Sequence, residues 1–330
     1  MSDVTVPDVR AAVRTDPLAV AAAGVTVLLW ASAFVGIRDA GAQIAAGPLA
    51  LGRLLVGGAV LGALVAARRE ALPPRADLPH LVLCGLLWFA AYNVILNSAE
   101  QRVDAGTAAM LVNIGPIFIA LLAGVLLREG FPRALLAGCA IAFAGAVVIG
   151  LATRGRSVDA GWGAALCIAA AAAYSGGVVA QKPLLERTSA LQVTFLACVV
   201  GAVACLPYAP ALVHDVRGAS APAVAWTVYL GVFPTAIGFT TWAYALRRTT
   251  AGRMGATLYL VPPLAVLMGW AALGEAPPAL APAGGGAVPR RGVRRPPGPD
   301  PGPAVRCGVA GDRPDAGGGT RTPTACATGT

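Results

Sequence analysis

AGTAAMLVNIGPIFIALLAGVLLREGFP, the stretch from Ala105 to Pro132, returns 146 residues later as AGRMGATLYLVPPLAVLMGWAALGEAPP, from Ala251 to Pro278. Without a gap, the two copies share the opening Ala-Gly pair, a proline near the middle, a glutamate near the end and the closing proline. Self-similarity at a fixed period is the sequence signature of repeated structural units. The chain is therefore expected to consist of two related halves.

The composition around this repeat is that of a membrane protein. The 330-residue chain is 57% hydrophobic and 12% charged, whereas soluble domains carry about 25% charged residues. Apolar stretches of roughly 20 residues recur along it, and each is long enough to cross the hydrocarbon core as a helix. We therefore predict an all-α integral membrane protein of the cell membrane, built from two inverted five-helix repeats and surrounded by the lipid bilayer.

Nine stretches are expected to span the bilayer. In the first half they cover residues 18–37, 44–67, 78–96, 106–127 and 134–152, and in the second 161–180, 191–209, 224–246 and 254–274. The predicted organisation is a leader (1–17), a first repeat (18–152), a linker (153–160), a second repeat (161–282) and a tail (283–330). The leader has no small-residue cleavage site, which favours a retained first span.

The distribution of basic residues predicts the orientation. With the N-terminus inside, the cytoplasmic segments hold 12 Lys and Arg residues and the opposite side holds 5, so the N-terminus is expected in the cytoplasm. An odd number of spans per half then inverts the second copy. Because the basic residues lie between spans and in the tail, orientation explains the net charge of +9 better than a nucleic-acid partner does.

The repeat also predicts a tenth span after Pro278, but APAGGGAVPRRGVRRPPGPDPGP follows there and cannot span. Residues 283–330 hold 12 Gly and 8 Pro without any Leu, Ile or Phe, and such a composition cannot bury a core. Reading Gly284–Val293 one base later restores codons for apolar residues. The sequence therefore indicates a reading frame that slips near Ala279–Gly286, with a genuine disordered basic tail as the alternative.

No cofactor or metal is expected. The seven cysteines are scattered without a C-x-x-C pair, and the two histidines, His80 and His214, lie far apart in the sequence. An intramembrane enzyme would need a nucleophile and base, or metal ligands at helical spacing such as H-E-x-x-H, and none is visible. We therefore predict that the protein is not an enzyme.

The order and spacing of four motifs resemble the drug/metabolite transporter superfamily, in its EamA-type branch. The motifs are WASAFVGIR from Trp30, PLALGRLL from Pro48, and the two repeated blocks, and the resemblance covers about Pro17 to Pro278. It implies a carrier that moves a small metabolite or drug-like solute, usually outward, by alternating access. In this family the first, third, fourth, sixth, eighth and ninth spans mainly line the cavity, and the missing tenth is peripheral.

An inactive, misfolded product of a frame-shifted gene is the alternative. The substrate, coupling ion and oligomeric state do not follow from the sequence.

Arg53 is the first candidate for a substrate-binding residue. It is the one charged residue well inside a predicted span, and a central arginine costs about 2.5–3.5 kcal/mol on insertion scales. Either it faces the bundle, where it holds an anionic group of the substrate or pairs across the bundle, or it lies near enough to Pro48 to reach the outer interface.

The other candidates are polar or bulky residues in five spans. At 100° per residue, Trp88 and Tyr92 share one face of the third span while Asn93 and Asn97 share another, so they cannot all face one cavity. Prolines inside membrane helices need local compensation and often mark a site, although kinking alone also explains them. The further candidates for substrate binding are Asn113, Tyr174, Trp242 and Tyr259, and those for helix breaking are Pro116, Pro234, Pro262 and Pro263.

Overall fold

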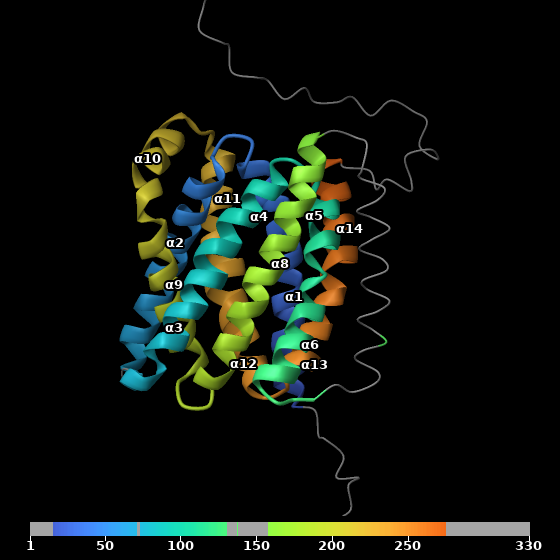
Figure 1. Ribbon diagram of the computed structural model, residues 1–330. Coiled ribbons are helices and arrows are strands. Elements are labelled where there is room, and N and C mark those ends of the chain that lie inside the picture. The colour runs from blue at the N-terminus through green and yellow to red at the C-terminus, as the bar shows by residue number, and fades with distance from the viewer. Residues whose placement is uncertain (1–15, 71–72, 131–136, 138–157, 275–330) are drawn as a thin grey trace, which may run out of the picture. The chain divides into compact units, whose positions relative to one another are not determined.

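The computed structural model describes residues 16–70, 73–130, 137 and 158–274 (Figure 1). Within these ranges the chain forms helices and connecting turns, and eight helical segments are long and apolar enough to cross a membrane. Each corresponds to a predicted span, so the prediction of an all-α membrane protein is confirmed. Four predicted features lie outside the described residues: the fifth span (134–152), most of the linker, the tail (283–330) and the site of the proposed frame slip.

Several spans consist of more than one helical segment. The first half contains α1 (Pro17–Ala40), α2 (Ala46–Arg68), η1 (Arg75–Asp77), α3 (Leu78–Cys84), η2 (Gly85–Ala91), α4 (Tyr92–Glu100), α5 (Ala105–Val112) and α6 (Gly115–Leu126). The second half contains α8 (Val158–Leu184), α9 (Ala190–Cys205), η3 (Leu206–Tyr208), α10 (Ala209–Gly218), α11 (Ala221–Leu230), η4 (Gly231–Gly238), α12 (Phe239–Arg247), α13 (Ala251–Thr257), η5 (Leu258–Leu260) and α14 (Val261–Leu273).

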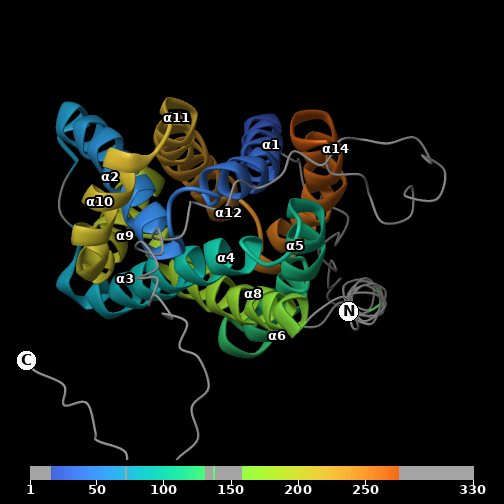
Figure 2. The ribbon, with the colours of Figure 1, turned by 90° about the horizontal axis from the view of Figure 1, so that it is seen from above.

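The helices run between two ends of the bundle. We name these the Pro17 end, where α1 begins, and the Ala40 end, where α1 finishes and α2 starts. Viewed from above (Figure 2), α2 and α9 lie at one side of the bundle and α5 and α14 at the other, with α1, α4 and α12 between them. Contacts of α1 with α11, α12 and α14 join the two sides.

The fourth and ninth spans, which carry the repeated motif, lie antiparallel. The first part of the fourth span, α5, packs against α14, the second part of the ninth, while α6 packs against α13 (Figure 1). The beginning of each of these two spans thus packs against the end of the other, as expected for two copies of opposite orientation. The antiparallel arrangement of the two motifs is therefore confirmed.

The inverted relation extends to two π-helical stretches. η2 begins at Gly85 and η4 at Gly231, which are separated by the same 146 residues as the motif. A Cβ atom on Gly85 would lie 2.8 Å from the carbonyl oxygen of Ala197, and one on Gly231 would lie 2.8 Å from that of Arg53. Because glycine allows this close approach of backbones, η2 packs directly on the seventh span and η4 on the second.

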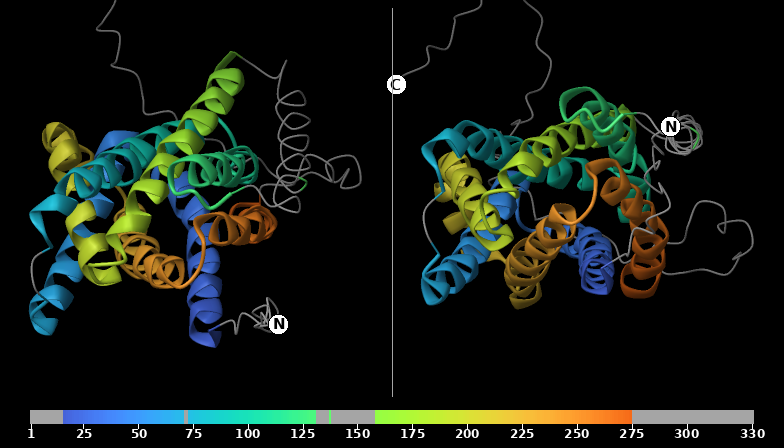
Figure 3. Two further views of the ribbon diagram at one scale, coloured as in Figure 1. Left: turned by 60° about the horizontal axis from the view of Figure 1, so that its bottom comes forward. Right: turned by 90° about the horizontal axis from the view of Figure 1, so that it is seen from below.

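The repeated Ala-Gly pair and glutamate have a structural explanation at the Pro17 end. Both carboxylate oxygens of Glu129 accept hydrogen bonds at the start of α13, from the N–H groups of Ala251 at 2.9 Å and Gly252 at 3.2 Å. An anion suits the unpaired N–H groups and the dipole of a helix N-terminus. The turn between α12 and α13, at the end facing the viewer in Figure 3, is thereby fixed to the first half. Glu275, the counterpart of Glu129, lies outside the described residues.

Candidate functional site

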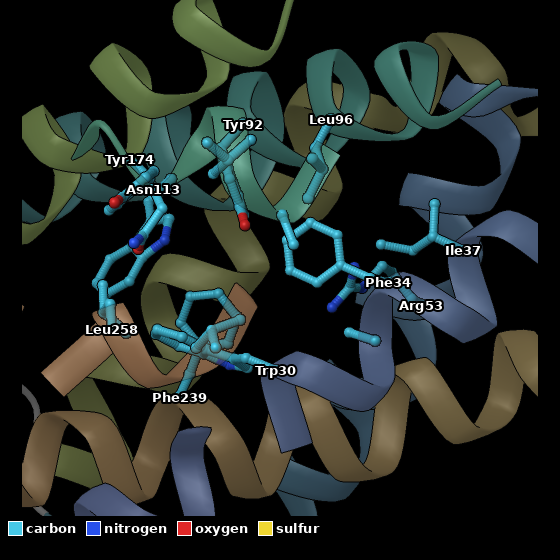
Figure 4. Close-up of a pocket in the computed structure, with 15 residues that line it drawn as sticks. Trp30, Phe34, Ile37, Arg53, Tyr92, Leu96, Asn113, Tyr174, Phe239 and Leu258 are labelled. Atoms are coloured by element: carbon cyan, nitrogen blue, oxygen red, sulfur yellow. The ribbon is translucent and has the colours of Figure 1, made fainter. Parts of the chain in front are cut away.

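A cavity lies between the helices (Figure 4), and its wall in α1, from Trp30 to Ile37, places it in the half of the bundle towards the Ala40 end. About 580 Å³ of space free of protein atoms lies within it, and part of this space is open to the surroundings. Among the described residues, seven spans contribute to its wall: the six spans that the family resemblance implied, together with the second. The lining residues are Trp30, Ala33, Phe34, Ile37, Arg53, Trp88, Tyr92, Leu96, Ala109, Val112, Asn113, Tyr174, Phe239, Leu258 and Val261.

Arg53 is the charged residue among the described residues of this cavity wall, and its side chain is buried, with 3% of the residue exposed. It lies seven residues into α2, about 10 Å along the helix axis from the start of that helix. Its Nε donates a hydrogen bond of 3.1 Å to Oγ1 of Thr235. The alternative in which Arg53 reaches the outer interface is therefore wrong for this structure, because the guanidinium points into the bundle (Figure 4).

Aromatic rings line the cavity on the side towards the Pro17 end. Trp30, Trp88 and Phe239 contact one another, with ring centroids 4.9 to 5.9 Å apart and tilted or edge-to-face planes. These are favourable geometries for aromatic pairs. The indole N–H of Trp30 also donates to the carbonyl oxygen of Pro234 at 3.2 Å. The first, third and eighth spans thus meet in one packed cluster, which we call the aromatic floor (Trp30, Trp88, Phe239).

The polar groups of the cavity lie mainly in the third, fourth and sixth spans. The rings of Tyr92 and Tyr174 are in edge-to-face contact, with centroids 5.4 Å apart. Figure 4 shows the Tyr92 hydroxyl pointing into the cavity, and Tyr174 with Asn113 across the cavity from Arg53. A solute in this cavity therefore meets a cation at one side, hydroxyl and amide groups at the other, and aromatic rings beneath.

Five of the candidates for substrate binding line the cavity, namely Arg53, Trp88, Tyr92, Asn113 and Tyr174. Three others do not. The Asn93 amide donates to the carbonyl oxygens of Trp88 and Phe89 in its own span, and Asn93 is absent from the cavity wall that Tyr92 lines. Trp242 is fully buried and stacks on Trp30 at 5.1 Å, and Tyr259 lies in η5 beside the lining residue Leu258.

The four candidate helix-breaking prolines interrupt helices in three places. Pro116 lies at the start of α6, after a turn that separates it from α5, and Pro262 and Pro263 lie at the start of α14, after η5. Pro234 lies inside η4. The prolines are absent from the cavity wall, but the breaks at Asn113 and Leu258 bring those residues to it. The prolines therefore shape the cavity wall without lining it.

Several lining residues were not predicted. Trp30 and Phe34 belong to the WASAFVGIR motif that carried the family resemblance, so an indication of their importance was present. Phe239 and Leu258 are apolar residues in apolar spans, and nothing in the sequence distinguishes them from residues that face lipid. Their place follows from helix packing.

The family model for EamA-like transporters matches residues 17–151 and 161–288 of this chain. The chain belongs to the EamA-like transporter family. The two matched segments lie one in each half of the chain, and membership makes the protein a membrane transporter.

Curated relatives of this EamA-like transporter extend over most of its length. A probable terminal-alkyne amino-acid exporter of Streptantibioticus cattleyicolor is 44% identical over 264 residues, which cover 79% of this chain and 87% of the relative. The uncharacterized transporter YdfC of Bacillus subtilis is 32% identical, over 78% of this chain and 84% of the relative. A solved crystal structure matches with a TM-score of 0.63 at 22% identity, over 81% of this chain and 94% of the other, which shows a shared fold.

Proposed function

We propose that this transporter exports small amphipathic solutes that carry a carboxylate, with amino acids of apolar side chain as the substrate class. One observation carries the proposal: Arg53 is buried at the wall of a cavity whose other described lining residues are uncharged, and mostly apolar. A cation in such a low-dielectric site attracts an anionic group strongly. The buried Glu100, outside the wall, also attracts Arg53, and direct contact with the guanidinium favours a solute that brings a negative charge.

The remaining wall fits the rest of an amino acid. With its carboxylate at Arg53, the solute places an apolar side chain against the aromatic floor. Its ammonium group then meets the Tyr92 hydroxyl, the Asn113 amide and the faces of aromatic rings, which attract cations. The similarity to a relative named as a probable terminal-alkyne amino-acid exporter supports this class, because such a substrate combines a carboxylate with a slim apolar side chain.

Alternating access is the mechanism that we propose for export. Inverted repeats provide two pseudo-equivalent halves that can rock around a central site. We infer that the aromatic floor closes the cavity towards the Pro17 end, which the distribution of basic residues predicts to face the cytoplasm. The described conformation then corresponds to a state turned away from the cytoplasm. The alternative of an inactive, frame-shifted product concerns residues outside the described ranges, and the experiment below also tests it.

The test is efflux from Escherichia coli that express the full chain and are loaded with labelled L-propargylglycine, a terminal-alkyne amino acid. We expect faster efflux than from cells with an empty vector, with competition by L-norleucine. Competition by the carboxamide of propargylglycine, which lacks the negative charge, should be at least about tenfold weaker. No efflux of the label from cells with correctly inserted protein, or equal competition by acid and amide, would contradict the proposal.

A further inference from the structure

We propose that Thr235 is a positioning residue for substrate recognition. Its hydroxyl fixes the Arg53 guanidinium so that the terminal nitrogens are presented to a carboxylate in the cavity. This inference rests on the proposed function, because it assumes that Arg53 receives the anionic group. Thr235 does not line the cavity and acts through Arg53 alone.

The geometry of the pair supports this role. Thr235 is 1% exposed, and its Oγ1 accepts the hydrogen bond from Nε of Arg53 at 3.1 Å. Within the described part of the chain this is the hydrogen bond that Arg53 makes. The guanidinium has five N–H groups in a fixed plane, so fixing Nε also fixes the direction of the terminal nitrogens. These point into the cavity (Figure 4).

Pro234 explains why Thr235 serves as an acceptor. Proline has no N–H, so the carbonyl group of Leu230, four residues earlier, loses its α-helical partner. The Thr235 hydroxyl donates to this carbonyl oxygen at 2.7 Å. Because a hydroxyl has one proton and two lone pairs, this bond uses the proton and leaves the lone pairs for Arg53. The break in the eighth span thus creates a buried acceptor of fixed orientation.

Two glycines bring the helices close enough for the pair to form. A Cβ atom on Gly57, one turn after Arg53, would lie 2.8 Å from Cγ2 of Thr235 and 2.9 Å from the carbonyl oxygen of Gly231. A Cβ atom on Gly231 would lie 2.5 Å from Cβ of Val56. Larger residues at these positions would separate α2 from η4. The close approach therefore sets the distance over which Arg53 reaches Thr235.

The experiment measures binding to the purified full chain in lipid nanodiscs. L-propargylglycine and its carboxamide are titrated while tryptophan fluorescence is recorded, since Trp30 and Trp88 lie in the cavity wall. Thr235→Val keeps the shape and removes the hydroxyl, and Thr235→Ser keeps the hydroxyl. The matched control is Thr227→Val, which removes a buried hydroxyl of the same protein that bonds the carbonyl oxygen of Ala223.

We expect Thr235→Val to weaken binding of the acid about tenfold and binding of the amide less than about twofold. Thr235→Ser should restore the preference for the acid, and Thr227→Val should leave it unchanged. When Arg53→Leu is already present, adding Thr235→Val should not weaken binding of the acid further, because the effects of residues that act through one contact are not additive.

Three outcomes would overturn the proposal for Thr235. The first is that Thr235→Val keeps the wild-type preference for the acid over the amide. The second is that Thr235→Ser loses this preference as much as Thr235→Val does, and the third is that the losses of affinity from Thr235→Val and Arg53→Leu add up in the double variant. If Thr235→Val fails to fold, Thr235→Cys, which is close in size and a weaker acceptor, replaces it with the same expected loss. Failure of the proposed function is distinguishable, because Arg53→Leu alone would then retain the wild-type preference for the acid.

Discussion

Replacing Arg53 by leucine removes the positive charge from the cavity. The structure predicts little damage to the fold, because the leucine side chain enters an apolar wall and Thr235 keeps its bond to the Leu230 carbonyl oxygen. Membrane insertion should even improve by about 3 kcal/mol, the difference between arginine and leucine at a helix centre on insertion scales. A loss of transport in this variant would therefore result from the change at the substrate site, and not from poorer folding or insertion.

The magnitude follows from the contact that is lost. A hydrogen bond to a charged group contributes about 1.5–3 kcal/mol. With 1.4 kcal/mol for each factor of ten, Arg53→Leu should weaken the affinity for an acidic substrate about 10- to 150-fold. Arg53→Lys should recover part of this loss, since an ammonium cannot reproduce the forked contact of a guanidinium.

The assay is efflux of labelled L-propargylglycine from proteoliposomes, normalised to the folded protein in the membrane. Wild type, Arg53→Leu and Arg53→Lys are compared over a range of internal concentrations, so that affinity and maximal rate are separated. Flux from Arg53→Leu near that of the wild type, with an unchanged apparent affinity, would refute the reasoning. Tyr92, Asn113 and the aromatic floor would then remain as the candidates for substrate contact.

Two further predictions concern the fold and the cavity wall. Glu129→Ala should lower the free energy of unfolding by about 1–2 kcal/mol, since two N–H groups of α13 lose their acceptor. The control is Glu186→Ala, at an exposed site. Equal thermal unfolding midpoints for the two variants would contradict this prediction. Gly115→Ala would place a Cβ atom 1.8 Å from the Tyr174 hydroxyl oxygen, whereas a Cβ atom on Gly24 meets nothing within 4 Å. We therefore expect Gly115→Ala, unlike Gly24→Ala, to displace Tyr174 and weaken binding of L-propargylglycine in the fluorescence titration. Identical binding curves would show that the wall accommodates the methyl group.

The sequence by itself determined the architecture of the described chain. Hydropathy located the eight spans because each must cover the hydrocarbon core, and the gap-free repeat predicted the antiparallel pairing of the fourth and ninth spans. Arg53 was conspicuous because a charge inside a span is costly unless the fold offsets it. The spacing of Trp88, Tyr92 and Asn93 correctly separated two faces of one helix.

The tertiary structure decided which of these faces line a cavity. In a membrane, lipid and protein interior are similarly apolar, so hydrophobic periodicity does not distinguish an inward-facing residue from one that faces lipid. The sequence analysis therefore named Trp242 as a candidate and not Phe239, and only packing places Phe239 at the cavity and Trp242 behind Trp30. Likewise, Arg53 and Thr235 are 182 residues apart, and their contact depends on a close approach of two helices that no local pattern specifies.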